Sequence, residues 1–286
     1  MTEILQLIIY GVIYGSIIAL GAVGVSLTFG VLRFANFAHG DLMTFGAYMV
    51  LAAYAGFALP MWLSVIVALA MTAALAVFID QTLFRRFRRA NPMILLISSF
   101  GVGLMVRSLV QIIWGGSTQV YDPGIQFPYQ FWGLRIRPDH LIILGGTLVL
   151  VVVLHVFLQK TRMGKAMRAM ADNPDLARIS GINTDRVVIW TWIMGASLAA
   201  AAGYFLALDS RLQPDMGWFI LLPVFAAAIL GGIGKPYGAI AGGFIIGITE
   251  ELSTLILSPA YKPAVAFALM VLILIFRPTG IFKGAR

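Results

Sequence analysis

Two groups of polar residues interrupt apolar sequence, and their side chains are the ones whose types could do chemistry. Asn36, His39 and Asp41 lie in the stretch RFANFAHGD, and Glu250 directly precedes Glu251. Interrupted helices are tolerated at membrane depth only against protein or a water-filled cavity. The stretch is therefore either a pathway-lining or gating element, or a simple polar turn in which His39 and Asp41 form a local hydrogen bond.

The paired carboxylates impose a geometric constraint on the helix that carries them. Adjacent side chains on an α-helix point about 100° apart. At most one of Glu250 and Glu251 easily faces a pore centre, and the other needs a packed partner or a shifted pKa. Arg107 is the one basic residue inside a predicted span. By default it faces protein or water, or else it extends to the outer surface.

The sequence contains no motif that indicates an enzyme. The sequence has no H-E-x-x-H and no G-x-S-x-G, and its Gly-Lys pair fails the phosphate-loop pattern, because Ile229 replaces the first glycine and Pro236 replaces the serine or threonine. Cysteine is absent, which excludes disulfides and thiol nucleophiles. The histidines are too scattered to predict a metal site: His39, His140 and His155. We expect a non-enzymatic chain that transports a solute and has no ATP-hydrolysing site of its own.

Composition places these residues in a membrane protein. The 286 residues are 60% hydrophobic and 11% charged, with a mean hydropathy of +0.93, whereas a soluble domain carries about 25% charged residues. The net charge of +8 reflects Lys and Arg gathered in a few loops, as the positive-inside rule predicts, and not a nucleic-acid surface. The N-terminus lacks a basic segment, so residues 4–30 are expected to be a retained span.

The apolar runs predict an all-α, polytopic transmembrane helical bundle that forms a single domain, residues 1–286. We expect eight or nine membrane segments, with interrupted helices within residues 22–57 and 217–257, where the count is least certain. The predicted spans are 4–30, 42–57, 60–83, 92–114, 141–158, 187–208, 217–230, 237–257 and 264–276. Residues 115–140 form a long periplasmic loop, in which the alternation at 131–137 allows either a small hairpin or a flat cap. Basic residues place residues 85–89, residues 159–186 and the C-terminus in the cytoplasm.

The loop 159–186 carries too many charges for the bilayer, where each costs about 2.5–3.5 kcal/mol. Its sequence predicts two helices separated at Asn173, which caps the second, while Pro174 occupies that helix's first position. Gly181 ends the second helix as a left-handed cap. Apolar residues recur every third position in this part of the loop: Leu176, Ile179 and Ile182. Such a ridge suits either docking into a partner's groove or contact with anionic lipid.

Three motifs, taken in order, resemble a known family. They are GVSLTFGV with NFAHGD (residues 24–31 and 36–41), GKAMRA with Asn173, Ala177 and Gly181-Ile182 (from residue 164), and GGIG with Gly238 and Gly242-Gly243 (from residue 231). Together they resemble bacterial branched-chain amino-acid ABC permeases of the LivH type, over almost the whole chain. Similar permeases serve urea, short amides and aromatic acids, so the resemblance leaves the solute open.

The resemblance implies a division of labour. A second, LivM-like permease would complete the pathway, two cytoplasmic ATPase subunits would hold ATP and magnesium, and a periplasmic binding protein would deliver the solute. This chain would bind no cofactor or metal of its own and would lie in the bacterial inner membrane. The cytoplasmic loop would become the coupling element that touches an ATPase, through Met167, Met170, Asn173, Pro174, Leu176, Ala177, Ile179, Gly181 and Ile182.

For the solute path or its gate we choose the polar residues of the apolar segments. The alternative for each is a buried hydrogen bond between helices. The candidates are Asn36, His39, Asp41, Ser98, Ser99 and Glu250. A different class of function, a self-contained channel or secondary carrier for a small solute such as urea, would need no amphipathic cytoplasmic helix.

Overall fold

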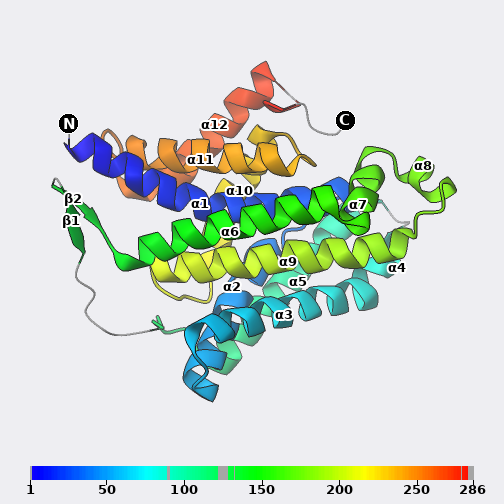
Figure 1. Cartoon of the computed structure of the whole chain (residues 1–286), viewed down its shortest axis with the longest axis horizontal. Helices are drawn as coiled ribbons and strands as arrows, with labels where there is room; N and C mark the ends of the chain where they lie inside the picture. Colours follow the sequence, from blue (N-terminus) through cyan, green and yellow to red (C-terminus); the bar gives the residue numbers. More distant parts are fainter. Residues whose placement is uncertain (1, 89–90, 122–127, 132, 278, 283–286) are drawn as a thin grey trace.

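The computed structural model describes residues 2–88, 91–121, 128–131, 133–277 and 279–282, and these form a bundle of helices (Figure 1). The elements are α1 Thr2–Leu32, α2 His39–Leu51, the π-helical turn Ala52–Gly56, α3 Met61–Ile79, the π-helical turn Asp80–Phe84, α4 Arg85–Phe87, α5 Pro92–Trp114, β1 Tyr129–Phe131, β2 Leu134–Ile136, α6 Pro138–Lys160, α7 Arg162–Asp172, α8 Pro174–Ile179, α9 Thr184–Asp209, α10 Met216–Gly231, α11 Pro236–Ser253, the 3-10 turn Pro259–Tyr261 and α12 Lys262–Phe276.

Six helical segments among the described residues are long and apolar enough to cross a membrane. They are Thr2–Leu32, Met61–Phe87, Pro92–Trp114, Pro138–Lys160, Thr184–Asp209 and Pro259–Phe276. The other predicted spans correspond to α2, α10 and α11, which are not among these six segments. The all-α class is therefore confirmed, while eight or nine full-length crossings are not.

Helices α1 and α9 form the buried centre, because small residues let other backbones approach them. A Cβ atom at Gly203 of α9 would collide with the backbone carbonyl of Met43 on α2, and one at Gly247 of α11 would collide with the backbone of Gly15 on α1. In contrast, α3, α5, α6 and α12 carry many exposed large apolar side chains. Such side chains suit a surface in contact with lipid.

The two ends of the bundle differ in character (Figure 1). At one end, the N-terminus of α1 holds the predicted hairpin, in which β1 and β2 pair antiparallel, because Gln6 exchanges two hydrogen bonds with the backbone of Arg135 at 2.9 and 2.8 Å. At the other end lie α7 and α8. The C-terminal segment reaches that same end, where the Ile281 amide donates to the Leu230 carbonyl and Lys235 pairs with Asp172.

Candidate functional site

The chain folds back sharply between α1 and α2, and this corner holds four of the predicted path residues. Arg33 has a positive φ of 59°, after which residues 34–38 carry the chain back along α1. His39, the first residue of α2, lies against Gly24, where a Cβ would be 2.7 Å from the imidazole Cε1. The interrupted helix that the sequence predicts here is therefore present, and it is enclosed by protein.

Two polar side chains hold the corner's backbone. The Phe37 amide donates to Ser99 Oγ on α5 at 3.0 Å, and the Ala38 amide donates to Asn36 Oδ1 at 3.1 Å. Both acceptors are almost fully buried. They satisfy amides ahead of α2 that have no carbonyl partner within a helix. Asn36 and Ser99 thus fix the shape of the corner, which is the alternative that the sequence left open for them.

Asp41 and Arg107 form an ion pair between α2 and α5. Arg107 Nε and Nη2 donate to the two carboxylate oxygens at 2.8 and 3.2 Å, and Asp41 is only 2% exposed. The guanidinium also lies 4.9 Å from the ring centre of Trp218 on α10, a cation–π arrangement. Arg107 therefore faces protein, and the alternative in which it extends to the outer surface is wrong. The local hydrogen bond between His39 and Asp41 is also absent, since both carboxylate oxygens of Asp41 accept from Arg107.

Two buried polar atoms of the corner remain without hydrogen-bond partners in the part of the chain that the structure describes. They are His39 Nε2 and Asn36 Nδ2. A buried donor or acceptor that is left unpaired costs about 1–3 kcal/mol. Other buried atoms without a partner lie on the surrounding helices, among them Trp192 Nε1 and Tyr48 OH, so this feature does not distinguish the corner.

Glu250 and Ser98 are not part of this cluster. Glu250 lies on α11 near the level of Gly11, where Ile248 packs against α1, whereas His39 lies beside Gly24. At 1.5 Å per residue the two levels of α1 are about 20 Å apart. Glu250 is fully buried, and neither of its carboxylate oxygens has a partner among the described residues. Ser98 is partly exposed and belongs to the neighbouring face of α5.

The charged loop folds as two helices, as the sequence predicts. Asn173 Oδ1 accepts from the Leu176 amide at 3.0 Å, which caps α8, and Pro174 is the first residue of that helix. Gly181 has a φ of 83°, the left-handed conformation that glycine adopts without strain. Leu176 is 56% exposed and Ile179 is 81% exposed, so α8 presents an uncovered apolar ridge.

Three of the predicted coupling residues face inward instead. Met167 is 2% exposed, Met170 is 8% exposed and Ala177 is 3% exposed, and all three belong to the main hydrophobic core. The methionine face of the amphipathic helix α7 packs onto the bundle, and Ala177 of α8 is covered as well, while the predicted coupling role of all three residues stays a prediction. They anchor the loop, while Ile182, which is partly buried, lies at the edge of its exposed ridge.

Some functional contacts could not be read from the pattern. Arg33 Nη2 donates to the Ala171 carbonyl near the end of α7 at 2.7 Å, which links the corner directly to the charged loop. Arg88 pairs with the buried Asp80 and also with Asp185, which stands 97 positions after Arg88 in the sequence. The sequence shows that Arg33 and Arg88 are charged. It does not identify their distant partners Ala171 and Asp185, because sequence spacing carries no information on such contacts. Among the described residues, no group of three ligand-type side chains could hold a metal ion.

Comparison with known proteins identifies the family. Residues 7–274 match the model described as "Branched-chain amino acid transport system / permease component". The chain belongs to this family. The permease is 35% identical to the Escherichia coli (strain K12) protein named high-affinity branched-chain amino acid transport system permease protein LivH, over 97% of this chain and 94% of that relative. It is 30% identical to the high-affinity branched-chain amino acid transport system permease protein BraD of Pseudomonas aeruginosa, over 97% and 95% of the two chains.

A solved structure supports the fold independently. The permease aligns with "PsaBC from Streptococcus pneumoniae in complex with Fab" with a TM-score of 0.52 and 15% identity, over 96% of this chain and 92% of the other. At this identity the likeness concerns the fold alone. The LivH-type resemblance inferred from the motifs is thus confirmed by the family match.

Proposed function

We propose that this permease is a membrane-spanning subunit of an ATP-driven importer and carries branched-chain amino acids. The observation that carries the proposal is the family match over residues 7–274, together with 35% identity to a permease named for high-affinity transport of these amino acids. The apolar bundle and the lack of a phosphate-binding loop fit a subunit that an external motor drives.

Helix α8 is the proposed contact with an ATPase subunit. Its ridge of Leu176 and Ile179 is uncovered, while the inward-facing methionines of α7 fasten the loop to the bundle. An amphipathic helix with apolar anchors at this spacing suits a groove on a partner. Lipid contact is less favoured, because α8 is only 6 residues long and follows directly on the anchored α7.

The hydrogen bond from Arg33 to Ala171 connects the proposed docking site on the charged loop to the corner between α1 and α2. A partner that moves α8 also moves the end of α7, and Arg33 connects that end to the corner between α1 and α2. The corner carries its own strained residue, since Arg33 has a positive φ. Closure of the ATPases would then bias the corner between two packings.

The proposed orientation puts α7, α8 and the C-terminal segment in the cytoplasm. Basic side chains gather at that end of the bundle, among them Arg33, Arg88 and Lys235, as the positive-inside rule requires. The N-terminus of α1 and the hairpin then face the periplasm (Figure 1). We propose nine membrane segments in total, of which three are the shorter helices α2, α10 and α11. An odd number of segments places the two ends of the chain at opposite faces of the membrane.

The remaining subunits of the proposed importer follow from the same family. A second permease would lie beside this one; the chain is also 25% identical to Escherichia coli LivM, over 92% of this chain and 67% of that relative. A periplasmic binding protein would deliver the amino acid to the hairpin end. ATP and magnesium would be held by the ATPase subunits.

The docking role is tested by charging the ridge. The double variant Leu176→Asp/Ile179→Asp should abolish ATP-dependent uptake of leucine in membrane vesicles, because carboxylates cannot enter an apolar groove without a large desolvation cost. Both side chains are exposed, so the subunit should still insert and reach wild-type levels. Co-purification of the ATPase should be lost in parallel.

Two controls make the result specific. Ser180→Asp adds a charge at the exposed position that follows Ile179 and should leave uptake within twofold of wild type. Purified permease alone in liposomes should pass no leucine or urea. Normal uptake by the double variant would refute the docking role, and robust flux through the isolated chain would favour the self-contained channel.

A further inference from the structure

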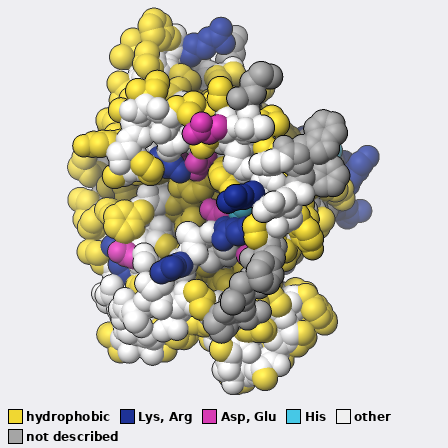
Figure 2. Space-filling model, turned by 90° about the vertical axis from the view of Figure 1, so that its left-hand side faces the viewer, with side chains coloured by type: hydrophobic (Ala, Val, Ile, Leu, Met, Phe, Trp, Pro, Cys, Tyr) yellow, Lys and Arg dark blue, Asp and Glu magenta, His cyan; other side chains and the backbone are white. Residues whose placement is uncertain are grey.

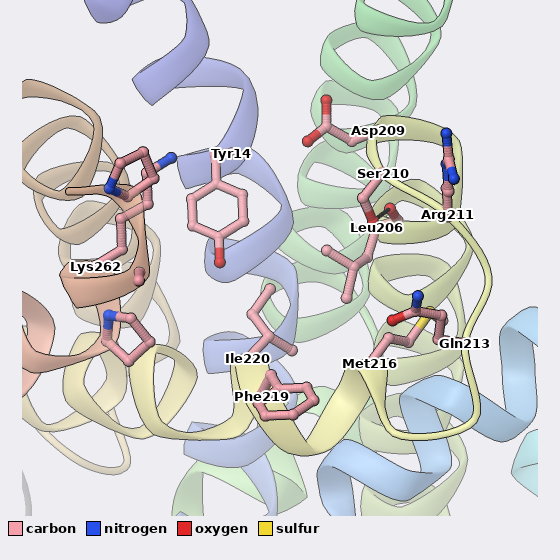
Figure 3. A pocket seen from close by; sticks show the side chains of 13 residues that line it. Tyr14, Leu206, Asp209, Ser210, Arg211, Gln213, Met216, Phe219, Ile220 and Lys262 are labelled. Atoms are coloured by element: carbon pink, nitrogen blue, oxygen red, sulfur yellow. Dashed lines mark hydrogen bonds between the residues drawn. The ribbon is translucent and has the colours of Figure 1, made fainter. Parts of the chain in front are cut away.

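An open cavity of about 610 Å³ lies at the hairpin end of the bundle, between α1, the α9–α10 connection and α12. Figure 2 looks onto this end and shows a hollow with a hydrophobic floor among charged side chains of both signs. In Figure 3, Lys262 stands on one side of the cavity, Asp209 and Arg211 stand on the facing side, and Phe219 and Ile220 lie below them. The cavity is therefore polar at its rim and apolar at its base.

A second cavity, of about 640 Å³, lies next to the first along α10. The two share Phe219 and Pro263 in their walls. Deeper in the second cavity, the wall is formed by Leu222, Phe225 and Ile229, which recur at helical spacing and lie on one face of α10. This wall is almost wholly apolar, and because the two cavities share wall residues, the apolar wall adjoins the cavity with the charged rim.

The corner between α1 and α2 closes this surface. Phe37 lies 5.3 Å from Phe225, measured between ring centres, and both rings line the second cavity. The Phe37 amide is held by Ser99, and the corner that carries Phe37 is tied to α7 through Arg33. The aromatic pair thus sits where the inner end of the apolar surface meets the element that the charged loop can move.

We infer that this face of α10 lines the solute path and that the Phe37–Phe225 pair is its gate. The inference rests on the proposed function and names the surface that performs it. The occupant is a small zwitterion with an aliphatic side chain. Charges of both signs at the rim suit its ammonium and carboxylate groups, and the apolar wall suits its side chain. A groove covered by lipid or by a partner helix would not need to open into a charged cavity.

The chain's lack of cysteine permits a direct test. Single cysteines replace Leu222, Phe225 or Ile229 in the assembled transporter, and a charged, membrane-impermeant methanethiosulfonate reagent probes each one with and without a non-hydrolysable ATP analogue. Controls are Ile112→Cys and Val152→Cys, at side chains that are 79% and 52% exposed on α5 and α6. We expect both positions to face lipid, where thiols stay protonated and unreactive.

The expected result is labelling at Leu222 and Phe225 at least tenfold faster than at the controls, with a rate that changes when the nucleotide binds. Labelling as slow as in the controls in every nucleotide state would overturn the inference, because it would place the face of α10 against lipid or a partner. The readout does not depend on which solute is carried. Failure of leucine uptake by the wild type would count against the proposed function alone.

The gate is tested by removing its rings. Phe37→Ala and Phe225→Ala should each raise ATP-independent leakage of leucine from loaded proteoliposomes at least tenfold, because an apolar plug is lost. Phe78→Ala, at a side chain that is 64% exposed on α3, should not. Wild-type tightness in both gate variants, in complexes that elute intact from a sizing column, would overturn the gating role.

Discussion

The ion pair between Asp41 and Arg107 offers the sharpest test of how the corner is held. Its geometry is bidentate, at 2.8 and 3.2 Å, and the side chains of Asp41 and Arg107 are only 2% and 16% exposed. Removing one partner of a buried pair leaves an uncompensated charge, which costs about 3–5 kcal/mol. At about 1.4 kcal/mol per factor of ten, a loss of 3 kcal/mol lowers the folding equilibrium constant more than a hundredfold.

The perturbation is a double-mutant cycle of Asp41→Asn and Arg107→Gln. Each single variant should lose about 3 kcal/mol or more of the free energy of unfolding. The double variant should return to within about 1–2 kcal/mol of wild type, since no buried charge remains in it and a neutral pair can still share a hydrogen bond. The cycle should therefore give a coupling energy of at least about 4 kcal/mol, because the two single losses together exceed the loss in the double variant by that amount.

The assay is equilibrium unfolding of the purified permease in mixed micelles, with denaturing detergent as the titrant. Arg85→Gln provides the comparison, because Arg85 pairs with Asp185 at 3.7 Å through side chains that are 55% and 62% exposed, and such a pair contributes less than about 1 kcal/mol. Strictly additive losses in the double variant, or single variants as stable as Arg85→Gln, would refute the reasoning.

Two further predictions concern local structure. Asn173→Ala removes the cap of α8 and should cost about 1 kcal/mol of local helix stability, seen as faster amide exchange in residues 174–179; unchanged exchange would contradict the capping role. Gly203→Val drives a side chain into the backbone of Met43 and should cost at least about 1–3 kcal/mol, measured as a lower unfolding temperature. Its control is Gly145→Ala, where a Cβ meets open space; equal melting of the two variants would contradict the close packing of α2 on α9.

Much of the architecture could be predicted from the sequence, because the bilayer constrains it so strongly. Long apolar runs must be helices when no water is available to satisfy the backbone, and the charges of residues 159–186 could only lie outside. The end of α7, the cap at Asn173 and the stop at Gly181 followed from local chemistry that acts within a few residues. For the hairpin and for the break between α1 and α2 the residues left two alternatives each, and the structure decided between them.

Side-chain orientation and the pairing of distant residues could not be predicted from the sequence. Periodicity identified the apolar residues of the charged loop, but the tertiary structure decided that Met167 packs inward while Ile179 remains outside. Asp41 was identified as a candidate, yet its partner Arg107 stands 66 positions away, and sequence spacing carries no information on such contacts.

The sequence by itself determined that this chain is a membrane bundle with a folded, charged loop and a broken helix, because hydropathy and capping act locally. Only the tertiary structure decided which surface is left for a solute. Asn36 and Ser99 bind backbone amides of the corner and Asp41 balances the charge of Arg107, while the apolar face of α10 lines an open cavity. That distinction depends on how distant helices pack, since burial is a property of the whole assembly of helices and not of any one segment.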